Sequence, residues 1–108
     1  MTARVSALPD NAGLSLSGVV DYASAEACLN AGVGVIGGLV PGDAPWVCDL
    51  SGLESGSSVT AAVLMGWQRA AGSRGRALAL RAVPGRLRAI LQASNLLSVF
   101  RLTDDEPR

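Results

Sequence analysis

Short apolar segments with a two-residue period alternate along this chain with longer segments of helical period, and this alternation limits the possible folds most strongly. Strands are predicted at 4–8, 13–20, 46–50 and 76–83, and helices at 24–36, 59–71 and 84–94. A strand–helix–strand succession requires a parallel pair, whereas the first two strands, joined by a short turn, form an antiparallel hairpin. The sequence therefore predicts an α/β fold with a mixed sheet, an N-terminal β-hairpin and helices packed on the sheet.

The segment 59–71 carries the clearest helical pattern. Its apolar residues recur at intervals of three and four and define one face: Val59, Ala62, Val63, Gly66, Trp67 and Ala70. We expect Trp67 in the core, whereas Trp46, which follows Pro45 at a strand start, is compatible with burial or half exposure. If the face with Val59, Val63 and Trp67 covers the sheet, Leu64 and Met65 are exposed and suit a partner surface. Burial against a neighbouring helix is the alternative.

A chain of 108 residues fits one domain, which we place at 1–103, followed by a short acidic tail at 104–108. Hydrophobic residues make up 49% of the chain and supply a core. Cys28 and Cys48 are too few for a disulfide scaffold, so we expect both to be buried and reduced. Because the chain has neither a secretory signal pattern nor an apolar run of about 20 residues, we expect a cytoplasmic protein with no direct membrane span.

Histidine and lysine are both absent, since all nine basic residues are arginine. This absence excludes Ser-His-Asp and Cys-His triads, histidine metal ligands, a Schiff-base lysine and a Walker-type phosphate lysine. Two cysteines also fall short of a zinc site. We therefore expect no catalytic residue, no metal and no cofactor, and the composition favours a binding or regulatory module over an enzyme.

Charge is segregated along the chain, although the formal net charge is zero. Residues 1–54 hold one arginine and six acidic residues (−5), residues 55–103 hold seven arginines and no acid (+7), and the tail adds −2. The lack of a basic excess argues against a nucleic-acid partner. Two arrangements remain open. The segments interleave in the fold and neutralise each other, or a basic surface over the third helix and nearby turns faces an acidic partner or lipid headgroups.

The only concentrated polar motif runs from Asp49 to Ser58, between the predicted central strand and the helix at 59–71. A helix N-terminus there offers free amide donors and hydroxyl caps, which suit a phosphate, a carboxylate or an acidic side chain of a partner. The helix dipole would also favour phosphorylation. The alternative is that Ser57 or Ser58 only caps the helix. We expect Asp49 to bind loop amides rather than act as a base.

Three motifs, in this order and spacing, resemble the STAS domain, the fold of sulfate transporter tails and of bacterial anti-sigma factor antagonists. The motifs are a strand that ends in Gly-x-x-Asp (14–21), Asp-Leu-Ser (49–51) followed by Ser-Ser-Val-Thr-Ala (57–61), and a third helix that ends in Ser-Asn-Leu-Leu (94–97). The resemblance covers nearly the whole chain. It implies a STAS-type mixed sheet.

Within that family the chain is most similar to the small STAS subunits of an ABC transporter that maintains outer-membrane phospholipid asymmetry. The resemblance implies binding to the ATPase subunit, in a complex with a membrane permease and a lipid-binding subunit, and a peripheral position at the inner membrane through that partner. It also places Ser58 where a hydroxyl residue matters for this binding. The predicted partner-binding residues are Ser57, Ser58, Val59, Thr60, Leu64 and Met65.

Ser58 also occupies the position that is phosphorylated in anti-sigma factor antagonists. An antagonist controlled by serine phosphorylation is therefore the alternative function. In those proteins an acidic residue precedes the hydroxyl, whereas Ser57 stands there in this chain. This departure weakens the phosphorylation hypothesis more than it weakens the hypothesis of a static interface.

Overall fold

The computed structural model describes residues 3–9, 12–39, 46–54, 56–96 and 100–102. Its elements are, in order, β1 (Arg4–Ala7), β2 (Gly13–Ser17), α1 (Tyr22–Gly37), β3 (Trp46–Asp49), α2 (Ser58–Gly72), β4 (Leu78–Arg81), α3 (Gly85–Ala93) and β5 (Arg101–Leu102). The predicted acidic tail lies outside the described residues. So do residues 10–11, between the first two predicted strands, and residues 97–99, which follow the third predicted helix. The described elements confirm the predicted order.

The five strands form one sheet in the order β1-β2-β3-β4-β5. β1 and β2 form an antiparallel hairpin with Arg4 opposite Ser17, and the remaining pairs are parallel. The predicted α/β class with a mixed sheet is therefore confirmed. β2 ends earlier than predicted because Gly18 has a φ of 84°, which breaks the extended pleat and turns the chain toward α1.

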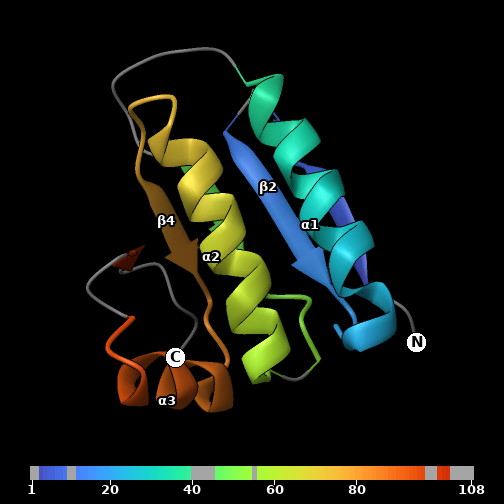
Figure 1. Cartoon of the computed structure of the whole chain (residues 1–108), viewed down its shortest axis with the longest axis vertical. Helices are drawn as coiled ribbons and strands as arrows, with labels where there is room; N and C mark the ends of the chain where they lie inside the picture. Colours follow the sequence, from blue (N-terminus) through green and yellow to red (C-terminus); the bar gives the residue numbers. More distant parts are fainter. Residues whose placement is uncertain (1–2, 10–11, 40–45, 55, 97–99, 103–108) are drawn as a thin grey trace.

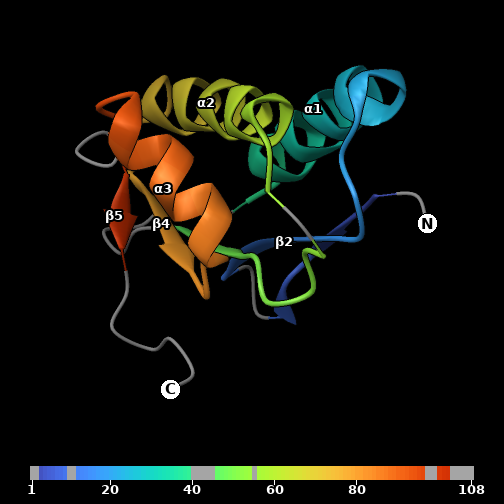
Figure 2. The ribbon, with the colours of Figure 1, turned by 90° about the horizontal axis from the view of Figure 1, so that it is seen from below.

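The molecule has one layer of helices on one face of the sheet (Figure 1). Figure 2 shows α1 and α2 lying side by side over the sheet, while α3 crosses its end near the carboxyl end of β4. The opposite face carries polar side chains, because Ser15, Asp49 and Arg81 pair across β2, β3 and β4 in one row. None of the helices that the structure describes is both long and apolar enough to cross a membrane.

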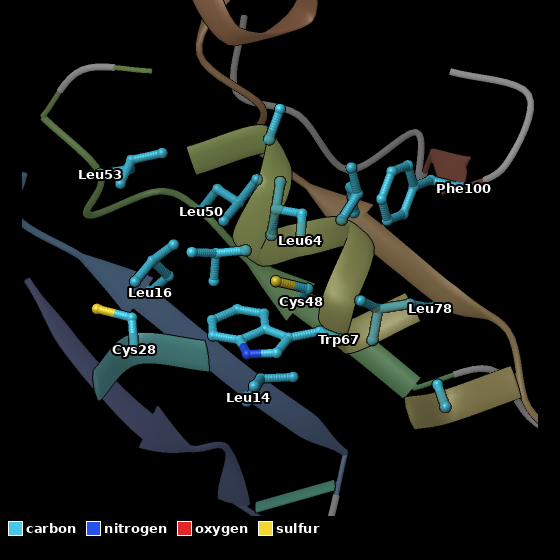
Figure 3. Close-up of a cluster of buried hydrophobic side chains, with 14 of the residues drawn as sticks. Leu14, Leu16, Cys28, Cys48, Leu50, Leu53, Leu64, Trp67, Leu78 and Phe100 are labelled. Carbon is cyan, nitrogen blue, oxygen red and sulfur yellow. The ribbon is translucent and has the colours of Figure 1, made fainter. Parts of the chain in front are cut away.

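The core lies between the sheet and the two helices, and Trp67 is at its centre (Figure 3). The Trp67 side chain is fully buried, as predicted, and its Nε1 donates to the carbonyl of Leu29 at 3.2 Å. The indole therefore packs against the sheet and also joins α2 to α1. Cys28 and Cys48 are buried and free, which confirms that expectation as well.

Two glycines allow α1 and α2 to approach closely. A Cβ atom at Gly32 would overlap the Trp67 indole, and a Cβ atom at Gly66 would overlap the Leu29 side chain. These glycines weaken their helices intrinsically, yet the contacts between the helices require them. The tertiary packing therefore explains why a helix with such poor propensity forms here.

α1 begins two residues before the predicted helix at 24–36. Asp21 is the N-cap: its Oδ1 accepts from the Ser24 amide at 2.9 Å, and the Asp21 amide donates to Ser24 Oγ at 3.0 Å. This reciprocal pair is a capping box with serine in the place usually taken by Glu or Gln. The Ser24 amide also lowers the pKa of Asp21. The helix consequently begins at Tyr22 and runs for 16 residues.

The described arginines after residue 55 are not all gathered on α3, which holds Arg86 and Arg88. Arg69 and Arg74 lie at the carboxyl end of α2, about 16 Å along that helix from the end near α3. Arg74 donates to the carbonyls of Gly37 and Leu39 at the end of α1, at 3.0 and 3.2 Å. The segments interleave at this point, as the first of the two predicted arrangements requires.

Trp46 is buried, with 2% of its surface exposed, so the alternative of half exposure is wrong. The guanidinium groups of Arg76 and Arg74 lie over its ring, 4.4 and 5.7 Å from the centroid. These cation–π contacts shield the indole at the end of the sheet where the strand begins.

Candidate functional site

The N-terminus of α2 brings the predicted hydroxyl residues together, but with different roles. Ser57 is the N-cap: its Oγ accepts from the Thr60 amide at 3.3 Å and lies 3.3 Å from Thr60 Oγ1. Ser58 is the first helical residue and is exposed, and within the described part of the chain its hydroxyl makes no hydrogen bond. Ser57 therefore satisfies the helix end, and the Ser58 hydroxyl remains available.

The six predicted partner-binding residues divide according to burial. Ser58 is exposed, while Ser57, Val59 and Met65 are half-buried. Thr60 and Leu64 are completely buried, so the expectation that Leu64 is exposed is wrong, and neither side chain offers a surface to a partner. Of the predicted residues that remain accessible, Ser58 and Val59 lie in the first turn of α2.

The buried face of α2 is rotated by about a quarter of a turn from the predicted stripe. Its most buried residues are Thr60, Val63, Leu64, Trp67 and Ala71. The predicted stripe centres instead on the side that packs against α1, where Gly66 meets Leu29. Leu64 is covered because it lies on this rotated face, beside Thr60 and Trp67, and points into the core (Figure 3).

An apolar groove of about 430 Å³ lies between the N-terminal halves of α1 and α2. Its lining residues from α1 are Tyr22, Ala25, Glu26 and Leu29, and those from α2 are Ser58, Val59, Ala62 and Val63. Tyr22 is 88% exposed, which is unusual for a large aromatic side chain in a small domain. The groove therefore joins the Ser58 hydroxyl to a larger apolar surface.

Sequence reasoning missed the α1 side of this groove. The sequence feature that could have indicated it is Tyr22, a large aromatic residue directly after the Asp21 cap. Its side chain is exposed at the start of α1. The pairing of the two helix starts is a tertiary effect, however, since Tyr22 and Ser58 are 36 positions apart. No periodic pattern in either helix indicates it.

Asp49 lies at the other end of the polar motif and has a structural role, as predicted. Its Oδ1 accepts from the Ser51 amide at 3.1 Å, its Oδ2 accepts from Ser51 Oγ at 3.1 Å, and Arg81 lies 3.4 Å away. Burial raises the pKa of Asp49, but the hydrogen bonds from Arg81 and Ser51 outweigh this effect and hold the pKa below 3.8. Both carboxylate oxygens are therefore engaged, and the lowered pKa makes the carboxylate a poor proton acceptor, which does not suit a general base.

The groove offers an apolar floor, the hydroxyl groups of Ser58 and Tyr22, and the carboxylate of Glu26. Across the described residues, no three acidic or cysteine side chains come together as they would around a metal ion. Such a surface is suited to holding another molecule by burial and a few polar contacts.

Comparisons with known proteins place these observations in a family. Residues 3–101 match the family model described as "Mlab, STAS domain". No curated protein sequence matches the chain significantly.

Among solved structures, the chain is similar to a chain of the Acinetobacter MlaFEDB complex in its ATP-bound Vtrans1 conformation. The two are 29% identical with a TM-score of 0.72, and the match covers 89% of this chain and 97% of that one. A putative anti-sigma factor antagonist of Thermotoga maritima is 19% identical with a TM-score of 0.64, over 90% of this chain and 82% of that one. A STAS-domain anti-sigma-factor antagonist of Planctomyces limnophilus is 20% identical with a TM-score of 0.61, over 94% and 87%. At these lower identities the two antagonists show a shared fold only.

Proposed function

The chain belongs to the MlaB-like STAS domain family, and from this premise we propose that it is a non-catalytic subunit that binds the ATPase subunit of an ABC-type phospholipid transporter and stabilises or regulates it. The observation that carries this proposal is the similarity to the MlaFEDB chain, which extends over nearly all of both chains. The exposed Ser58 and the apolar groove beside it supply a surface for such binding.

In this proposal the STAS domain spans 1–103 and works in the cytoplasm, held at the inner membrane by its partner. The complete assembly also contains a membrane permease and a lipid-binding subunit, and it maintains the lipid asymmetry of the outer membrane. The protein contributes binding free energy and no chemical step, in keeping with a chain that has no histidine or lysine.

An anti-sigma factor antagonist controlled by phosphorylation of Ser58 is the competing function. One observation favours it: the Ser58 hydroxyl is exposed at a helix N-terminus, where the dipole stabilises a phosphate. The residue before it is Ser57, which is engaged as the cap and carries no charge. We rank this function second because both antagonist structures resemble the chain in fold only.

Substitutions at the two adjacent serines test the proposed surface. We expect Ser58→Asp to keep the fold, because the carboxylate is compatible with the helix dipole, and to weaken binding to the ATPase subunit about tenfold or more, which equals about 1.4 kcal/mol. The physical reason is that an interface would bury this carboxylate without a partner. Circular dichroism checks the fold, and a calorimetric titration with the purified ATPase subunit gives the affinity.

Ser57→Ala is the matched control. It removes the hydroxyl that accepts from the Thr60 amide and should lower the free energy of unfolding by about 1 kcal/mol, which measures the cap separately from the surface at Ser58. Ser58→Ala should leave the stability almost unchanged, since this hydroxyl caps nothing among the described residues. An unchanged affinity for Ser58→Asp in a folded protein would show that Ser58 lies outside the interface.

Purification of the tagged protein from its native membranes separates the two functions. A transporter subunit should bring down an ATPase and a membrane permease. Recovery of a sigma-regulating kinase without an ATPase, together with a mass increase of one phosphate that Ser58→Ala abolishes, would favour the antagonist instead.

A further inference from the structure

The groove between α1 and α2 has an acidic side. Glu26 is exposed in its α1 wall, and Asp21, also exposed, caps the same helix next to Tyr22. Glu54 is exposed four residues before Ser58, and its amide donates to the Gly18 carbonyl at 2.8 Å, which places it beside the approach to α1. Glu26 is the charged residue that lines the groove within the described part of the chain, and Asp21 and Glu54 lie next to its two helix starts.

The basic residues of the described chain lie elsewhere. Arg69 is in the last turn of α2, about 16 Å along the helix from Ser58. Arg81 pairs with Asp49 on the opposite face of the sheet, and Arg88 borders a different hollow, at the carboxyl ends of β3 and β4. Arg4 lies on the edge strand β1, opposite Ser17. Among the described residues, no arginine lines the groove itself.

We propose that the occupant of this groove is a segment of a partner protein that inserts an apolar side chain between Leu29 and Val59 and presents an arginine or lysine to Glu26. This inference rests on the proposed function, because it describes the part of the ATPase subunit that docks beside Ser58. The volume of about 430 Å³ accommodates one or two large side chains. Tyr22, almost fully exposed on one rim, would cover the inserted side chain and exclude water from it.

The two contributions act on different rate constants. Burial of the apolar side chain supplies the affinity, because an exposed ion pair adds only about 0–1 kcal/mol. The acidic side attracts the basic segment over a distance, so its main effect is on the association rate and on its dependence on salt.

Charge variants on α1 test the electrostatic part of the proposal with the purified ATPase subunit. We expect Glu26→Gln to lower the association rate about threefold at low salt, and this difference should largely disappear at about 1 M salt. Val33→Lys is the control: it changes the charge by the same amount at another exposed position of α1, about two turns from Glu26 and about one turn beyond the last groove residue of that helix, Leu29, and should leave the rate within about twofold. An equal effect of the two variants, or none from Glu26→Gln, would overturn the proposal while leaving the Ser58 result intact.

Photo-crosslinking from position 22 identifies the chemistry of the occupant directly. With p-benzoylphenylalanine in place of Tyr22, peptide mapping should locate the crosslink on an apolar segment with an arginine or lysine within about one helical turn. A crosslink to an acidic or uncharged segment, to a second copy of this chain or to lipid would contradict the proposal.

The two proposals can fail separately. If the ATPase subunit does not bind, the proposed function fails, and the same crosslinking in native membranes then decides the inference. A basic, apolar segment of another protein supports it in that case, and the absence of any crosslinked protein overturns it.

Discussion

Ser57 and Ser58 show that a shift of one position along the chain changes the role of a serine side chain completely. The two side chains are identical and adjacent, yet Ser57 closes the helix end through the Thr60 amide and Ser58 faces solvent. A shift of the helix start by one residue would exchange these roles. Only the backbone geometry distinguishes them, because the cap residue is extended (φ −147°, ψ 173°) and the next residue is helical.

Asp49 gives a prediction about pH. Because hydrogen bonds from Arg81 and Ser51 hold its pKa below 3.8 despite burial, the ionised carboxylate stabilises the fold at pH values above 3.8, and this stabilisation is lost as the pH falls through the lower folded value. We expect Asp49→Asn to be less stable than the natural chain by about 1 kcal/mol at pH 7, and the gap should narrow below about pH 4. Urea unfolding at a series of pH values measures this gap.

Arg81→Gln serves as the second arm of that experiment, since it removes the same pair from the other side. Its stability should also converge with that of the natural chain in acid. A gap that stays constant from neutral pH to about pH 3 would contradict an ionic contribution from Asp49.

At the scale of elements, the contact between α1 and α2 depends on small residues facing large ones. Gly32 faces the Trp67 indole and Gly66 faces the Leu29 side chain, so each helix supplies one glycine and one large partner. The close approach lets the Trp67 Nε1 reach the Leu29 carbonyl. It also fixes the separation of the helices at the groove, which begins at Leu29 and runs toward Tyr22.

A matched pair of glycines in α1 tests this packing. Gly32→Ala should destabilise the protein by about 1–3 kcal/mol, because its methyl group would overlap the Trp67 ring. Gly34→Ala has open space around the new methyl group and should instead stabilise the protein by about 1 kcal/mol through helix propensity. Thermal unfolding measures both changes, and shifts of the same sign would contradict the proposed contact.

At the scale of the whole molecule, the charge segregation along the chain is partly reversed by folding. Arg74, from the basic part, donates to carbonyls at the end of α1, and Arg81 pairs with Asp49 from the acidic part. The groove near the start of α1 keeps its acidic side, because no arginine of the described chain lines it.

The reactivities of the two thiols compare the free energy of local opening at the edge of the sheet with that of global unfolding. Cys48 is in the central strand β3 with no exposed surface, whereas Cys28 borders a hollow of about 310 Å³ between α1 and the edge strand β1. Burial raises the pKa of both thiols, so alkylation requires opening of the structure. We expect Cys28 to react faster, through local opening of β1, and Cys48 to react only on global unfolding.

Alkylation with iodoacetamide followed by peptide mass spectrometry measures the two rates separately. The Cys48 rate should rise steeply with urea, and the Cys28 rate should rise less steeply at low urea. Equal rates and equal urea dependences would mean that β1 and the central strand open together.

The order of the elements, the parallel and antiparallel pairings and the burial of Trp67, Cys28 and Cys48 were all predictable from the amino-acid sequence. Local patterns suffice for these features, since strand and helix periods, turns and the geometry of crossover connections act over short stretches of chain. The polar motif at the start of α2 was also recognisable, and so was the structural role of Asp49.

Which side chains of the polar motif and of α2 are accessible depends on how the elements pack together. The predicted exposure of Leu64 was wrong because the packing of α2 on the sheet turns inward a different face from the one that its apolar pattern marks, which no pattern within one helix can show. The groove likewise required Tyr22 and Ser58 to meet from two separate helices. A sequence pattern shows which face of each helix or strand is apolar and which is polar. The packing of the elements against each other determines which of these side chains form one surface.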